Sequence, residues 1–153
     1  MNLTARQINK KEQGFTLIEL LVVIGILAVL MGIVLVAINP ARQFNQANDA
    51  KRGNDIRQIL NAIGAYSADN KGALPSGITT SVQDIKTGGA DLCTALVPTY
   101  ISALPEDPSI LNGAAITDCS SYDSGYSVIQ DSAGRVTISA SHSAITSDLS
   151  VTR

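Results

Sequence analysis

Two features near the start of the chain could take part in chemistry. Residues 1–14 carry a net charge of +2 and end at Gly14, which directly precedes Phe15, and Glu19 lies four residues after Phe15. Glu19 stands inside a long apolar run, where an unpaired carboxylate is costly and is by default a functional residue.

Three interpretations of this segment differ in how they explain Glu19. A secretory signal has an apolar region of about 7–15 residues followed by a small-residue cleavage site. The apolar stretch here is longer, and "VAINPAR" contains no such site. A plain membrane anchor explains every residue except Glu19. A third possibility is that Glu19 extends to the lipid headgroups, since it lies only four residues inside Phe15.

The apolar segment is long enough to cross a membrane. Phe15–Ile38 forms 24 consecutive positions in which only Thr16 and Glu19 are strongly polar. A helix of that length spans roughly 36 Å, against a hydrocarbon core of about 30 Å. Basic residues precede the segment, so the positive-inside tendency places the N-terminus in the cytoplasm and the rest of the chain outside.

The segment "KKEQGFTLIELLVVIGILAVL" resembles the leader and N-terminal segment of type IV pilins and of type II secretion pseudopilins. The matching elements are a short basic leader, glycine directly before phenylalanine, "TLIE" and a long apolar run. The resemblance is strongest over Lys10–Val36. It continues more loosely through "DIRQILNAIGAYSADNKGALP".

The resemblance implies a processing pathway and a filament. A membrane-embedded prepilin peptidase would cut between Gly14 and Phe15 and methylate the new amine of Phe15. In the filament, Glu19 of an incoming subunit would form a salt bridge with the Phe15 amine of a neighbour, a pairing that is strong at low dielectric. The implied partners are further copies of the chain, other minor pilins, an assembly platform protein with its ATPase, and membrane lipid.

Beyond the membrane segment, the sequence predicts a second helical half over residues 39–71. Asn39–Pro40 should kink the helix, because proline lacks the N–H donor and clashes with the preceding turn. This proline falls later than in the common pilin pattern, so we expect any local melting during assembly between Gly32 and Pro40. Apolar residues then recur at three- and four-residue steps and predict one buried face: Ile56, Ile59, Leu60, Ile63 and Tyr66.

Residues 72–153 should form a globular head. "GYSVIQD" and "RVTISAS" alternate as strands do and are separated by "SAG", which predicts a hairpin, and "AITSDLSVT" could add a third strand. Residues 76–89 have a loop-like composition, and Leu92–Val97 predicts a short helix. The expected fold is α+β: a long kinked N-terminal helix, transmembrane in its first half, with a small antiparallel sheet packed on its second half.

The head contains two cysteines and several candidate metal ligands. Cys93 and Cys119 could form one disulfide if the head lies outside the cytoplasm, or remain two buried thiols. Asp107, Asp118 and Asp123 could ligate calcium, but their spacing matches no known loop, so we interpret them as solvated turn carboxylates. The "DPWGNPY" turn of the major type II pseudopilins is also missing, which leaves the type of filament open.

Charge excludes some functions and favours others. The head has a net charge of −5, which repels phosphate and disfavours nucleic acid, and aromatic residues make up only 4% of the chain. The basic residues of the second helical half would instead face acidic heads of neighbouring subunits: Arg42, Lys51, Arg52 and Arg57. "TGGAD" lacks the lysine of a phosphate loop, so no cofactor is expected.

The sequence as a whole predicts a structural subunit rather than an enzyme. We expect a single-pass protein of the inner or cytoplasmic membrane that, after cleavage, enters a cell-surface or periplasmic filament. The alternative is a membrane-anchored extracytoplasmic binding or enzymatic domain that never polymerises. Cleavage alone does not separate these two, because an anchored domain could also be processed.

Overall fold

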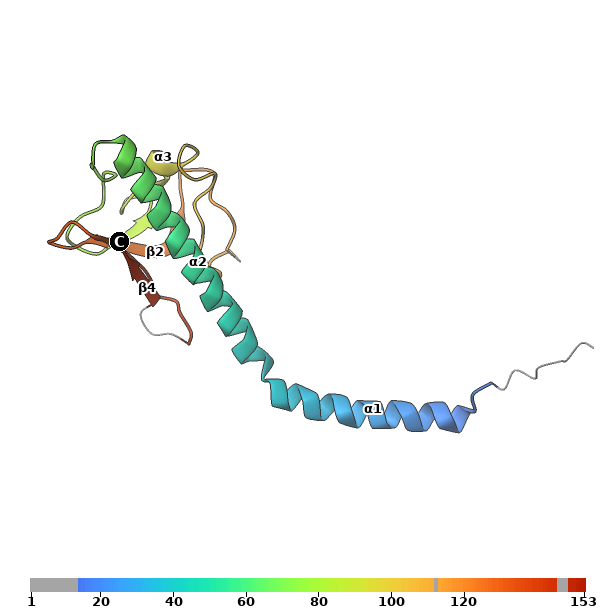
Figure 1. The fold of residues 1–153 in the computed structure, drawn as a ribbon. Helices are drawn as coiled ribbons and strands as arrows, with labels where there is room; N and C mark the ends of the chain where they lie inside the picture. The colour runs from blue at the N-terminus through green and yellow to red at the C-terminus, as the bar shows by residue number, and fades with distance from the viewer. Residues whose placement is uncertain (1–13, 112, 146–148) are drawn as a thin grey trace, which may run out of the picture. The chain divides into compact units, whose positions relative to one another are not determined.

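A computed structural model describes residues 14–111, 113–145 and 149–153 (Figure 1). Its elements are α1 (Leu17–Ile38), α2 (Pro40–Asp69), β1 (Gln83–Lys86), α3 (Cys93–Leu96), β2 (Asp123–Gln130), β3 (Val136–Ala140) and β4 (Leu149–Thr152). The expected α+β class is confirmed. The chain divides into two units between Pro40 and Ala41.

The first unit contains α1, a helix that is apolar on all sides. None of its residues is buried against other parts of the chain. It is long and apolar enough to span a membrane. The helix is continuous through Gly32, so the melting expected there during assembly remains a prediction.

The helical run is interrupted at Asn39, as the Asn39–Pro40 pair predicted. Asn39 is left-handed, with φ of 47°, a conformation that asparagine tolerates better than most residues. Pro40 is the first residue of α2, a position where the missing N–H has no helical partner to lose. The interruption therefore separates α1 from α2 at the junction of the two units.

The second unit has four antiparallel strands in the order β1-β2-β3-β4. The predicted hairpin is β2–β3, and the tentative third strand is β4. The loop prediction for residues 76–89 is wrong where β1 forms. Its sequence QDIK holds one apolar residue, Ile85, so it shows no alternation; β1 is defined by its pairing with the distant β2.

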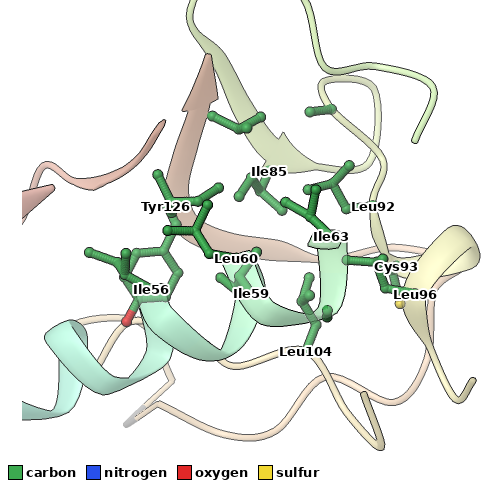
Figure 2. Packing of buried hydrophobic residues seen from close by; sticks show 14 of the residues in the cluster. Ile56, Ile59, Leu60, Ile63, Ile85, Leu92, Cys93, Leu96, Leu104 and Tyr126 are labelled. Carbon is green, nitrogen blue, oxygen red and sulfur yellow. The ribbon is translucent and has the colours of Figure 1, made fainter. Parts of the chain in front are cut away.

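The core lies between α2 and the sheet. The predicted apolar face of α2 is buried, with Ile56 and Ile59 at 0% exposure, and it faces Ile85 of β1 and Tyr126 of β2 (Figure 2). Burying a side chain of this size contributes about 1.5–3 kcal/mol. The face of α2 that lacked a partner in the sequence is therefore covered by the head of the same chain.

A disulfide joins Cys93 in α3 to Cys119, with the two Cα atoms 5.4 Å apart. Tyr122 supports the same region. Its hydroxyl accepts a hydrogen bond from the Cys93 N–H at 3.1 Å and donates one to Asp91 at 2.9 Å. The disulfide and this hydroxyl fasten the short α3 to the segment that leads into β2.

Candidate processing and assembly site

The Gly14–Phe15 peptide bond lies in an exposed, non-helical segment directly before α1. Residues 14–16 are outside the helix, and Phe15 is 91% exposed. No heavy atom outside the neighbouring residues lies within 4 Å of where a side chain on Gly14 would begin. The peptide bond is therefore not covered by any other described part of the chain.

Glu19 forms a capping box with Thr16 at the start of α1. The Glu19 N–H donates to the Thr16 hydroxyl at 3.2 Å. In return, the Glu19 carboxylate accepts hydrogen bonds from the Thr16 N–H at 2.8 Å and from its hydroxyl at 2.7 Å. These bonds satisfy donors at the helix start that have no partner within the helix.

Sequence reasoning missed this capping box, although its signal was present. Thr16 and Glu19 have the T-x-x-E spacing that predicts such a box before an apolar run. Both hydrogen bonds from Thr16 to the carboxylate use one oxygen, Oε2. Oε1 has no partner among the described residues. Glu19 therefore retains capacity to accept a hydrogen bond from another group while it caps its own helix.

A second polar cluster lies on α2, where the helix extends beyond the apolar core. Arg52 is 2% exposed and binds Asp107 through two bonds, Nε to Oδ2 at 2.8 Å and Nη2 to Oδ1 at 3.0 Å. Arg52 also donates to Asp49 at 2.7 Å and to the Ser109 hydroxyl at 2.6 Å. This two-pronged geometry is the strongest form of a guanidinium–carboxylate pair.

The Arg52–Asp107 pair corrects two expectations. Arg52 was expected to face the acidic head of a neighbouring subunit, and Asp107 was expected to be a solvated turn residue. Both are buried and bind each other within one chain. Burial acts most strongly on the pKa of Asp107 and would raise it, but the hydrogen bonds from Arg52 and Ser109 outweigh burial and lower the pKa.

Asp49 lies one helical turn before Arg52 and anchors a distant loop. It accepts hydrogen bonds from the Ser143 hydroxyl at 2.9 Å and from the N–H groups of Ala144 and Ile145 at 3.3 and 3.0 Å. Burial is the largest influence on its pKa and acts to raise it. The bonds from Arg52 and the loop together outweigh burial and lower the pKa of Asp49 to about 2.

Lys51 is likewise used within its own chain. Its ammonium binds Asp55 at 3.2 Å and the backbone carbonyls of Glu106 and Gly113 at 3.0 and 3.4 Å. Asp55 also accepts a hydrogen bond from the Tyr126 hydroxyl at 2.9 Å. Burial, and then the neighbouring Asp55, raises the pKa of Tyr126. Charged and polar side chains therefore hold the part of α2 around residues 49–55 to the loops of the head.

The three calcium candidates lie in different surroundings. Asp118 and Asp123 are exposed and each accepts a hydrogen bond from the backbone N–H two residues ahead, at Ser120 and Gly125. Asp107 is bound to Arg52. Within the described ranges, no three histidine, cysteine or acidic side chains are grouped to hold a metal ion.

Comparison with known proteins matches one part of the chain. Residues 9–35 match the family described as the prokaryotic N-terminal methylation motif. The match includes Gly14, Phe15 and Glu19 and most of α1. No curated protein and no solved structure matches the chain.

Proposed function

Because this chain carries the prepilin motif of type IV pilins and pseudopilins, we propose that it is a structural subunit of a type IV pilus-like filament. The motif indicates a structural rather than a catalytic protein. The observation that carries the proposal is the exposed Gly14–Phe15 bond directly before an apolar 22-residue helix, α1. Processing at that bond would convert a membrane-anchored precursor into an assembly-competent subunit.

Cleavage is proposed between Gly14 and Phe15, followed by methylation of the Phe15 amine by the same prepilin peptidase. The open backbone at Gly14 supports this, because a side chain there would have to fit the protease cleft. We propose that residues 1–14 form the leader, 15–38 the membrane and assembly helix, 39–71 the stalk helix and 72–153 the head. The N-terminus is proposed to be cytoplasmic and the head extracytoplasmic.

Glu19 is proposed to pair with the Phe15 amine of a neighbouring subunit. In the uncleaved chain its Oε2 caps α1 through Thr16, and Oε1 is the oxygen we assign to the neighbour's ammonium. An unpaired carboxylate in lipid is costly, so a subunit alone in the membrane is less favourable than one paired in a filament. Glu19 thereby links helix capping and subunit insertion in one side chain.

The first test is the intact mass and N-terminal sequence of the protein purified from its native membrane. We expect a chain that begins at Phe15 and is heavier by one methyl group. A chain that still begins at Met1, in cells with an active prepilin peptidase, would contradict the processing proposal. The anchored domain that does not polymerise would then be the better interpretation.

The second test separates a filament subunit from an anchored domain. Glu19→Ala should still be cleaved, yet filament yield should fall by about tenfold or more, since one desolvated charge pair is lost per subunit. Glu19→Gln, which keeps the size and loses the charge, should behave in the same way. Normal filaments from either Glu19 variant would rule out the pairing.

Thr16→Ala is the matched control. It removes the hydroxyl of the capping box and keeps the carboxylate, so helix stability should fall by about 1 kcal/mol. Filaments should still form, because the charge that pairs between subunits is intact. Loss of filaments in this control as well would mean that capping, rather than pairing, accounts for the Glu19 phenotype.

A further inference from the structure

Opposite charges lie near the two edges of the sheet. β1 and β4 are the outer strands of the four-stranded order, so residues on them lie at opposite edges. Arg153 directly follows β4, whereas Lys86 of β1 pairs in register with Asp123. What each edge can offer to another molecule therefore depends on the charged side chains that are not already paired within the chain.

Near the β4 edge, two arginines have no acidic partner in the described part of the chain. Arg57 on α2 and Arg153 line an open hollow of about 220 Å³ between the helix and the strand. Arg153 is held in register by two backbone hydrogen bonds with Val136, at 2.8 and 2.9 Å, and its guanidinium donates to Asn61 at 2.7 Å. Among the described residues, the hydrogen bond of the Arg57 guanidinium is a long one, 3.4 Å, to Asn54.

Near the β1 edge lies a larger hollow, of about 710 Å³, with an acidic rim. Asp118 and Asp123 are exposed on that rim, and the apolar side chains of Ile110 and Ile116 contribute to its lining. Lys86 also lines it, but its ammonium is already paired with Asp84 at 2.9 Å. The charged residues that line this hollow are Lys86, Glu106, Asp118 and Asp123, with a net charge of −2. An apolar lining with carboxylates at the rim suits the aliphatic stem and cationic tip of an arginine.

We propose that the basic surface (Arg57 and Arg153) of one subunit docks on the acidic hollow (Asp118 and Asp123) of the next subunit. The proposal rests on the proposed function, since it names a head-to-head contact within the filament. The partner is a second copy of this chain because both complementary surfaces are on the same molecule. A contact between two different surfaces repeats without pairing off into a closed dimer, and such contacts generate rings or open filaments.

Charge repulsion is the measurable consequence. The variant Arg57→Glu with Arg153→Glu should lose filament yield by about tenfold or more, because it sets like charges against each other. The variant Asp118→Lys with Asp123→Lys should lose yield to a similar extent. Lys71→Glu is the control. Lys71 is an exposed lysine beyond the end of α2 that lines neither hollow, and this variant should assemble normally.

Variants that restore filament yield test whether these two surfaces contact each other directly. Carrying all four substitutions on one chain exchanges the two charges and should restore filament yield. Co-expressing the two double variants should also restore it, because alternating subunits then meet with opposite charges at every contact. Each variant must still be processed to a chain starting at Phe15 and must unfold at the wild-type temperature, so that loss of yield reports the contact and not the fold.

The possible outcomes are distinct. If the wild type forms filaments and the double variants do so equally well, the head contact is wrong and the proposed function stands. If the double variants fail and neither the exchanged chain nor co-expression restores filaments, this pairing is also wrong. If the wild type itself forms no filament under assembly conditions, the proposed function fails, and the contact that rests on it fails too.

Discussion

Glu19 and Arg52 are charged residues whose hydrogen-bond partners lie at very different distances along the chain. Glu19 binds Thr16, three residues away, so its capping role needs only a helix start. Arg52 binds Asp107, 55 residues away, and is 2% exposed, so its partner exists only in the folded head. Glu19 keeps one carboxylate oxygen without a partner among the described residues, whereas Arg52 is committed to partners in its own chain.

Removing the Arg52 guanidinium should destabilise the head strongly. Arg52→Met leaves the carboxylates of Asp107 and Asp49 buried without their main partner, and breaking a buried pair in this way costs about 3–5 kcal/mol. Urea unfolding of the purified protein in detergent measures the loss. Arg57→Met, at an exposed position of the same helix, should stay within about 0.5 kcal/mol of wild type. Equal effects of the two substitutions would show that the buried network adds nothing to stability.

At the scale of elements, α2 has two kinds of buried surface in succession. Around Ile56 and Ile63 its apolar side chains pack on the sheet, as Figure 2 shows for the labelled residues. Before that stretch, Asp49 and Arg52 contact the loops that precede β2 and β4. The polar cluster thus extends the contact of α2 with the head beyond the reach of the strands.

The disulfide should contribute substantially to the stability of these elements. Cys93 and Cys119 are 26 residues apart, and closing a loop of that size destabilises the unfolded chain by about 3.5 kcal/mol. Adding a reductant, or replacing both cysteines by alanine, should lower the unfolding free energy by that amount in detergent-purified protein. The double-alanine protein is the control for the reductant and should not respond to it. Unchanged stability after verified reduction would contradict this contribution.

At the scale of the whole molecule, the charge distribution differs from the one the composition suggests. The basic side chains in the stretch 39–71 were expected to be available to neighbouring subunits. Lys51 and Arg52 instead bind carboxylates of their own chain. Arg57 and Arg153 remain exposed near β4, and Asp118 and Asp123 remain exposed near β1. The head and α2 together therefore carry separated charges that the net charge of −5 of residues 72–153 does not reveal.

The head should be stable over a wide pH range and lose stability at both ends. The lowered pKa of Asp49, about 2, stabilises the folded state above the unfolded value of about 4 and loses this effect as the pH falls toward 2. Burial raises the pKa of Tyr122 to about 12. Its contribution is complete below the unfolded value of about 10 and is lost as the pH rises toward 12.

Urea midpoints measured across this pH range check the prediction. The profile should be flat between about pH 4 and 10, with a decline on each side. Asp49→Asn should flatten part of the acid limb, and Tyr122→Phe should flatten part of the alkaline limb. The remaining acid limb should come from Asp107, Asp118 and Asp131, whose pKa values are also lowered. A profile that is already sloping at neutral pH in the wild type would contradict these assignments.

The sequence by itself determined the features that are encoded locally. Five features each depend on residues close together in the chain: the prepilin motif, the apolar helix α1, the interruption at Asn39–Pro40, the hairpin β2–β3 and the buried face of α2. Periodicity, capping and turn residues act over one or two turns or strands, so the pattern is complete in the sequence. The capping box of Thr16 and Glu19 was also readable there, although it was missed.

Only the tertiary structure decided the features that join distant segments. β1 forms because β2 offers it a pairing edge, and Arg52 meets Asp107 across 55 residues of chain. Asp49 meets Ser143 across 94 residues, and Cys93 meets Cys119 in a disulfide that the sequence left as one of two possibilities. Such contacts appear only when folding closes the intervening loops, so no local pattern of residue types records which partners will meet.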